Sequence, residues 1–168
     1  WHCSDRICQA GRAQHPALIW EDYRGEAKRY SYDDVRVLTN TFAAFLQDLG
    51  LKRGDRICLF MDRVPELYLG FLGVLKMGGI VQPLFSAFGE ESLWTRLDNA
   101  QTTAIVTQMK HARKVRKIKD QLPHLKHVIV VDADDPAVLK EFETPLALET
   151  LPRVEDEDEI VGRVRAAK

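Results

Sequence analysis

The sequence predicts an α/β fold: a mostly parallel sheet flanked by helices and preceded by a small β-hairpin. Short apolar runs alternate with helical patterns from residue 31 to residue 131, which is typical of βαβ units with parallel strands. The 168 residues are 45% apolar and 29% charged, with a net charge of −1, which is the composition of a globular chain. The longest apolar run, 64–75, contains Pro65 and Glu66 and falls short of the roughly 20 residues that a membrane-spanning helix needs.

The first predicted element is the β-hairpin. The runs 17–20 and 28–31 have strand character, and they flank the turn Tyr23-Arg-Gly-Glu26. Gly25 in this turn relieves the backbone strain of a tight connection.

The next predicted element is a helix that begins after Ser31. Ser31 is an expected N-cap, and Asp34 three residues later completes a short capping box. Gly50 is expected to end the helix in the left-handed conformation. Between them, apolar side chains recur at helical spacing and predict one buried stripe, formed by Val35, Leu38, Phe42, Phe45, Leu46 and Leu49.

The rest of the fold follows by the same alternation. Strands are predicted at 56–61, 80–84, 102–107 and 128–131, and helices at 65–77, 90–99 and 110–121. After residue 142 the pattern weakens, and Pro145, Pro152 and the acidic run 155–159 predict an extended connector. We therefore divide the chain into an α/β domain, 1–142, and a connector, 143–168.

Composition excludes several classes of function. Cys3, Cys8 and Cys58 are too few and too scattered for a disulfide framework, and the five histidines lack zinc-binding spacing. We therefore expect no bound metal and a reducing, cytoplasmic compartment. The nearly neutral charge argues against a dedicated nucleic-acid binder.

No self-contained catalytic set is visible. The sequence contains no G-x-x-x-x-G-K-[ST], no G-x-G-x-x-G and no G-x-S-x-G motif. We assign no catalytic residue.

A strongly basic helix is the first candidate binding feature. Lys110, Arg113, Lys114, Arg116, Lys117 and Lys119 fall within ten residues. Arginines in this pattern suit phosphate recognition, whereas the simpler interpretation is a solvated charged face.

Two other features carry alternatives. Asp132 ends a predicted parallel strand and precedes two further aspartates, so it fits either a phosphoacceptor or an ordinary turn and helix cap; we favour the turn. In the loop after strand 80–84, Phe85 and Phe88 flank small residues. These rings can stack on a planar base or fill the core.

Taken together, four phrases of the sequence resemble the N-terminal segment of acyl-adenylate-forming enzymes, over about residues 15–135. The phrases are Tyr30-Ser-Tyr-Asp-Asp-Val35, Leu49-Gly-Leu-Lys-Arg-Gly-Asp-Arg-Ile57, Pro65-Glu-Leu67 and Leu75-Lys-Met-Gly-Gly-Ile-Val-Gln-Pro-Leu84. Met77 departs from the alanine that is usual in the last phrase. The run that follows, from Pro83 to Leu97, is most similar to acetyl-CoA synthetases and their short- and medium-chain relatives.

The resemblance implies a reaction and a binding site. Members of this family join a carboxylate to ATP, with Mg²⁺, as an acyl-adenylate, and coenzyme A then displaces AMP. It implies that Phe85, Ser86 and Ala87 pack on the adenine end of coenzyme A and that Arg113, with Arg116 nearby, contacts the 3′-phosphate. Ser86 and Ala87 stand where the family often has two glycines. Arg96 is expected to be structural.

The same resemblance places the phosphate loop, the catalytic lysine and the acyl pocket beyond this segment. We therefore expect the segment alone to be inert, to hold no tightly bound cofactor, to take the rest of the synthetase chain as its partner, and to self-associate weakly through apolar surface. Two competing hypotheses remain open at this point: a stand-alone regulatory module that is phosphorylated on Asp132, and a ligand-free interaction module that docks an acidic partner on the helix 110–119.

Overall fold

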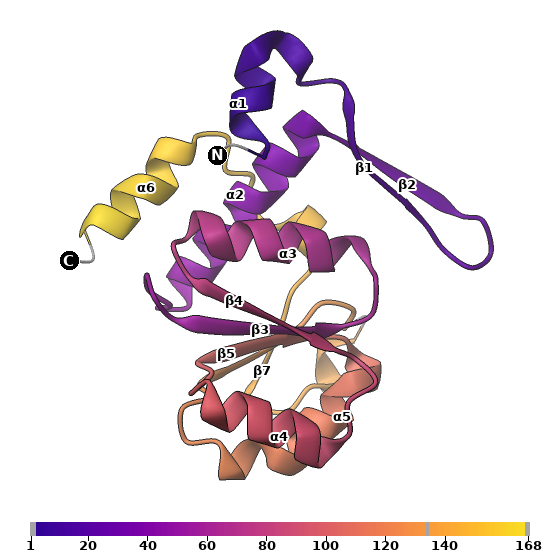
Figure 1. Ribbon diagram of the computed structural model, residues 1–168, viewed down its shortest axis with the longest axis vertical. Coiled ribbons are helices and arrows are strands. Elements are labelled where there is room, and N and C mark those ends of the chain that lie inside the picture. The colour runs from indigo at the N-terminus through magenta and orange to yellow at the C-terminus, as the bar shows by residue number, and fades with distance from the viewer. Residues whose placement is uncertain (1–2, 134, 167–168) are drawn as a thin grey trace.

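A computed structural model describes residues 3–133 and 135–166, and it has the predicted α/β architecture (Figure 1). Five parallel strands form one sheet in the order β4-β3-β5-β6-β7. The strands are β3 (Arg56–Met61), β4 (Ile80–Phe85), β5 (Ala104–Thr107), β6 (His127–Val130) and β7 (Glu143–Pro145).

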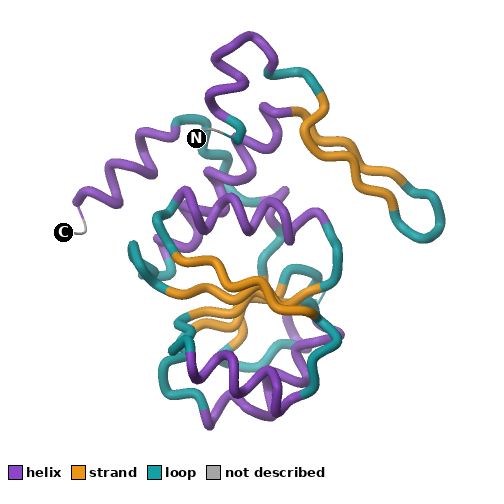
Figure 2. The backbone as a smooth tube through the Cα atoms, in the orientation of Figure 1, coloured by secondary structure: helices purple, strands orange, loops and turns teal. Residues whose placement is uncertain are grey.

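Helices cover both faces of this sheet. Figure 1 shows α2 and α3 above it and α4 and α5 below it, and Figure 2 shows the strands as a single layer between the helices. The helices are α2 (Tyr32–Asp48), α3 (Pro65–Lys76), α4 (Glu90–Asn99), α5 (Met109–Ile118) and α6 (Glu157–Ala166). Single 3₁₀ turns cover Lys119–Gln121, Pro136–Val138 and Leu148–Thr150. None of the helices in the described ranges is long and apolar enough to cross a membrane.

Strand β3 lies inside the sheet and faces two cores. Ile57 and Leu59 pack with α2 and α3, whereas Cys58 and Phe60 pack with α4 and α5. This alternation follows from the pleat of a strand, whose successive side chains point to opposite faces. A sheet covered on both sides needs apolar residues at every position, which explains the unbroken apolar run of β3.

Helix α2 begins at the predicted capping box. The Ser31 hydroxyl oxygen accepts from the Asp34 amide at 3.1 Å, and the Asp34 carboxylate accepts from the Ser31 amide at 2.9 Å. Gly50 has φ of 83°, the left-handed conformation predicted for the end of this helix.

The hairpin consists of β1 (Pro16–Glu21) and β2 (Ala27–Ser31), which pair antiparallel. Gly25 in its turn has φ of 85°. The Trp20 indole nitrogen donates to the carbonyl oxygen of Arg63 at 2.6 Å, which joins the hairpin to the end of β3.

The structure differs from the sequence prediction at both ends. A short helical segment, α1 (Asp5–Ile7) followed by a π-helical stretch (Cys8–Arg12), precedes the hairpin and was not expected. The segment expected to be an extended connector begins with β7, whose pairing with β6 adds a fifth strand to the sheet, and it contains α6. The division of the chain at residue 142 remains a prediction. Residues 167 and 168, the last two of the predicted connector, lie outside the described ranges.

Two glycines on α3 provide a matched test of how closely α2 and α3 pack. A Cβ on Gly73 would lie 2.6 Å from Cδ1 of Phe42 and 3.1 Å from the carbonyl oxygen of Thr39, whereas the nearest atom to a Cβ on Gly70 is a Leu59 methyl at 3.5 Å. Gly73→Ala should lower the free energy of unfolding by about 1–2 kcal/mol, because overpacking outweighs the gain in helix propensity.

Gly70→Ala removes the same backbone freedom without the clash, and it should raise the free energy of unfolding by about 0.5–1 kcal/mol. Urea denaturation of the two variants measures both values. Equal effects at the two positions would show that the close approach at Gly73 does not limit the packing.

Candidate functional site

The carboxyl edge of the sheet contains a reversal of strand order, which is the position at which α/β proteins bind ligands. After β3 the chain adds β4 on one side and then crosses to add β5 on the other, so the strand order reverses between β3 and β5. Ligands of open α/β sheets bind outside the strand ends at such a reversal. Asp62, just after β3, and Gln108, just after β5, lie at this point, and the Asp62 amide donates to the Gln108 side-chain oxygen at 2.9 Å.

Asp62 is the centre of a polar cluster at this edge. Its carboxylate forms an ion pair with Lys110 and lies 2.9 Å from Nε2 of His111. Hydrogen bonds from Lys110, Ser86 and His111 hold the pKa of Asp62 well below its ordinary value, although burial acts in the opposite direction. The cluster joins the end of β3, the loop after β4 and the first turn of α5.

The loop that carries Phe85, Ser86 and Ala87 lies at the same edge. The Phe85 ring is 67% exposed, and its edge meets Phe88 with ring centroids 6.0 Å apart. Phe88 packs against the core that lies between the sheet and the helices α4 and α5. The guanidinium of Arg96 lies 4.2 Å from the centroid of the Phe88 ring. The two phenylalanines therefore divide the predicted roles: Phe88 fills the core, whereas Phe85 presents a ring to solvent.

Arg113 lies on α5 and is exposed. Within residues 3–133 and 135–166, no ion pair or hydrogen bond engages its side chain. Its guanidinium is therefore open to an incoming anion.

Arg116 has a different environment from the predicted one. Its Nε and Nη2 donate to the two carboxylate oxygens of Glu143 at 2.7 Å each, and the Glu143 side chain has no exposed surface. Nη2 also donates to the carbonyl oxygen of Val138 at 3.2 Å. This bidentate pair gives Arg116 a structural role between α5 and β7, so its guanidinium is already occupied and the predicted phosphate contact falls to Arg113 alone.

Most of the other basic side chains of α5 also bind within the molecule. Lys117 forms a salt bridge with Glu90 at 2.5 Å, and Lys114 donates to two loop carbonyls. The ammonium of Lys119 lies 6.0 Å from the centroid of the Phe142 ring. Three of the six basic side chains of this segment, Lys110, Arg116 and Lys117, are paired with carboxylates, which reduces the charge that is left for an acidic partner of the interaction-module hypothesis.

Asp132 serves as a cap. Its carboxylate accepts from the Met109 amide at the start of α5 at 2.5 Å, and Gln108 lies 3.5 Å from its other oxygen. The turn interpretation predicted a cap for the helix that follows Asp132, whereas Asp132 contacts α5, which precedes it, and the next turn, Pro136–Val138, is capped by Asp135. Asp134 lies outside the described residues. No group of three or more His, Cys, Asp or Glu side chains is positioned to hold a metal ion in the part of the chain that the structure describes.

Sequence reasoning missed Asp62, His111 and the contacts of Lys114. None of these residues belongs to a recognisable motif. The one available signal was the position of Asp62 directly after a buried strand, where ligands of α/β folds gather. The contacts of Lys114 join segments 26 and 28 residues apart, so spacing along α5 did not indicate them.

Comparison with known proteins gives consistent results. Residues 6–161 match the family described as AMP-binding enzyme. The chain is 35% identical to an acetyl-coenzyme A synthetase of Bacillus subtilis over 131 residues, which is 77% of this chain and 22% of that protein. It is 32% identical to a crotonobetaine/carnitine–CoA ligase of Salmonella enteritidis over 123 residues, which is 72% of this chain and 24% of that protein.

A solved structure shares the fold. An anthranilate CoA ligase in complex with anthranoyl-AMP superposes with a TM-score of 0.70 at 19% identity, over 77% of this chain and 24% of that one. The chain thus spans about a quarter or less of the length of the relatives that it matches. Since the family match covers nearly the whole described chain, this chain belongs to the AMP-binding enzyme family.

Proposed function

We propose that this chain is the N-terminal part of an AMP-forming acyl-CoA synthetase. In the proposed reaction a carboxylate and ATP form an acyl-adenylate and pyrophosphate, and coenzyme A then displaces AMP. Family membership supports this class, and the relatives named as acetyl-coenzyme A synthetase and crotonobetaine/carnitine–CoA ligase support a short- or medium-chain acid, with acetate as the first choice.

Within this reaction, we assign the carboxyl edge of the sheet to coenzyme A. The observation that carries the assignment is that an exposed aromatic ring, Phe85, and an exposed arginine, Arg113, lie on two segments that are joined by the hydrogen bonds of Lys114. An exposed ring offers a stacking surface for adenine, and a guanidinium binds a phosphate with two parallel hydrogen bonds. Ser86 and Ala87 complete the loop beside the ring.

ATP and Mg²⁺ belong to the proposed reaction but not to these residues. We assign no residue of this chain to the triphosphate or to the metal. We expect the 168-residue chain alone to be inactive in both half-reactions, and the compartment that we propose is the cytoplasm.

The assignment predicts how Arg113 discriminates between two ligands. In the full-length protein that contains this chain, Arg113→Glu should raise the KM for coenzyme A by about 10–100-fold, because a charge-assisted phosphate contact is replaced by repulsion. It should change the KM for dephospho-coenzyme A, which lacks the 3′-phosphate, by less than about threefold. Carboxylate-dependent ATP–pyrophosphate exchange should be unchanged, because adenylate formation precedes coenzyme A binding.

The matched control is Lys117→Glu, which reverses a charge one turn further along the same helix. Lys117 is paired with Glu90 on the surface, so this variant should change the KM values for the two ligands to a similar extent. Equal losses for both ligands with Arg113→Glu, or a lowered rate of exchange, would contradict the assignment of Arg113 to the 3′-phosphate.

A further inference from the structure

Helix α5 holds the Phe85 loop in place through one lysine. Nζ of Lys114 donates to the carbonyl oxygens of Ser86 and Phe88, at 2.9 Å each. The same ammonium lies 5.4 Å from the centroid of the ring of Phe60, which belongs to β3. Two backbone carbonyls that flank Ala87 are thus fixed to α5 by a single side chain.

A second interaction links the same loop to Asp62. The Ser86 side chain interacts with the Asp62 carboxylate, and this interaction is among the causes that lower the pKa of Asp62. Asp62 is itself held by Lys110 and His111 of α5. The loop after β4 is therefore tied to α5 directly by Lys114 and indirectly through Asp62.

These contacts separate the roles of two neighbouring cations. Lys114 is half-buried, and two of its three N–H donors point to loop carbonyls, so its ammonium is already occupied. Arg113, the residue before it, is exposed. A phosphate that approaches α5 therefore meets Arg113, whereas Lys114 serves the loop.

We propose that Lys114 is a positioning residue that holds Phe85, Ser86 and Ala87 as a fixed surface for the adenine ring of coenzyme A. The proposal rests on the proposed function, because it assigns the loop to the same ligand. Without Lys114 the loop loses two charge-assisted hydrogen bonds and samples other conformations. A ligand that stacks on the loop must then order it on binding, and this cost in free energy lowers the affinity.

The test compares coenzyme A with dephospho-coenzyme A in the full-length protein. Lys114→Met keeps the aliphatic stem and removes the donors, and it should raise the KM for both ligands by about tenfold, an effect equivalent to about 1.4 kcal/mol. The ratio of the two KM values should stay as in the wild type, because the adenine surface is common to both ligands. Carboxylate-dependent ATP–pyrophosphate exchange should be unchanged.

Lys117→Met is the matched control, since it removes the same charge from the same helix at a surface pair. It should leave both KM values within about twofold of the wild type. Lys114→Gln gives a second measurement if the methionine variant folds poorly. It keeps a donor but no charge, and its KM for both ligands should lie between those of the wild type and of Lys114→Met.

Two outcomes would overturn the proposal. A rise in the KM for coenzyme A alone would show that Lys114 contacts the 3′-phosphate, and wild-type values for both ligands would show that the loop needs no anchor. Arg113→Glu distinguishes this failure from that of the proposed function. If Arg113→Glu raises the KM for coenzyme A more than the KM for dephospho-coenzyme A, only the role of Lys114 is wrong. If it raises both equally, the coenzyme A assignment fails as well.

Discussion

Replacing Arg116 with methionine should lower the free energy of unfolding by about 3–5 kcal/mol, because it leaves the Glu143 carboxylate buried without its partner. The Glu143 side chain is fully buried, and its two oxygens accept hydrogen bonds from two nitrogens of the Arg116 guanidinium at 2.7 Å each. Lys117→Met on the same helix, at a half-exposed pair, should cost no more than about 1 kcal/mol. Urea denaturation at pH 7 measures both.

The same pair predicts a pH dependence. Burial raises the pKa of Glu143, and hydrogen bonds from Arg116 and the Lys140 amide lower it further than burial raises it, so the net pKa lies below the ordinary 4.5. A carboxyl with a lowered pKa stabilises the fold above its unfolded pKa, and this stabilisation is lost as the pH falls through the folded pKa.

In Arg116→Met, burial dominates and the shift reverses. The difference in stability between the wild type and this variant should therefore shrink between pH 7 and pH 4. A difference that stays constant over this range would show that Glu143 is not the group left unpaired.

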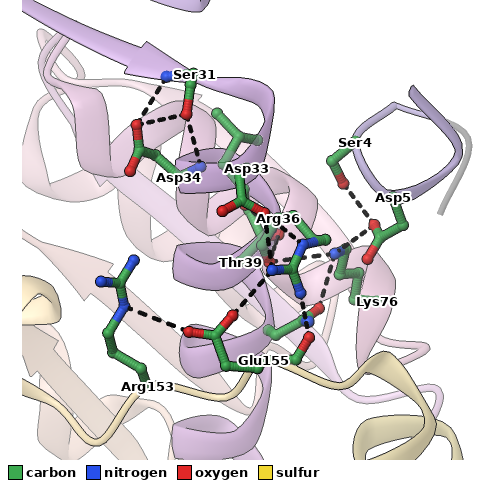
Figure 3. A network of polar contacts seen from close by, with 12 residues as sticks. Ser4, Asp5, Ser31, Asp33, Asp34, Arg36, Thr39, Lys76, Arg153 and Glu155 are labelled. Atoms are coloured by element: carbon green, nitrogen blue, oxygen red, sulfur yellow. Dashed lines mark hydrogen bonds and ion pairs between the residues drawn. The ribbon is translucent and has the colours of Figure 1, made fainter. Parts of the chain in front are cut away.

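The second large effect should come from Lys76→Met. Nζ of Lys76 lies 2.7 Å from the Asp5 carboxylate, and both side chains are almost completely buried (Figure 3). The same ammonium donates to the Asn40 side-chain oxygen at 2.7 Å, and the Ser4 hydroxyl donates to Asp5 at 2.6 Å. Removal of the lysine leaves a buried carboxylate that costs about 3–5 kcal/mol if it stays in place.

Asp5 lies in a short helical segment outside the sheet, whereas Glu143 lies in β7, which is hydrogen-bonded to β6. We expect the helical segment 5–12 to detach and expose Asp5 to water, which limits the loss to the free energy that holds this segment. Trypsin should then cleave after Arg12 at least about tenfold faster than in the wild type, while the urea midpoint falls by less than for Arg116→Met. Lys76→Met combined with Asp5→Leu should restore most of the protection, because it removes both charges.

A cleavage rate at Arg12 that does not change in Lys76→Met would contradict this account. It would mean that other contacts hold the segment in place. If the urea midpoint falls equally in Lys76→Met and in Arg116→Met, the segment 5–12 does not detach.

The sequence predicted the central elements well because each had a local cause. Ser31 and Asp34 form the capping box within four residues, and Gly50 supplies the left-handed end of α2. The predicted strand 56–61 and helix 90–99 have the observed bounds, since periodicity and flanking turn residues act over short distances.

The elements that were missed depend on distant partners. Strand β7 is three residues long and includes a proline and a buried glutamate, which no strand pattern predicts. It forms because Arg116 neutralises Glu143 and β6 offers a free edge. The helical segment near Asp5 likewise depends on Lys76, 71 residues further along the chain.

The candidate site was predicted only in part for the same reason. The exposure of Phe85 and Arg113 agrees with the roles that the family resemblance implied, and those roles stay a proposal. Arg116 looked equivalent to Arg113 on the helix, and only the fold distinguishes them, since Glu143 reaches one and not the other. The part played by Lys114 required knowledge of where two backbone carbonyls lie.

Helix α2 supports both ends of the described chain. Arg36 pairs with Glu155 at 2.9 Å (Figure 3). The Val154 amide donates to the Thr41 hydroxyl at 3.1 Å, and Asn40 accepts from Lys76. A local fluctuation that frays α2 must therefore release two segments more than 100 residues apart in sequence, whereas the exposed tip of the hairpin can open by itself. Amide protons in the middle of α2 should therefore exchange more slowly than those at the hairpin tip.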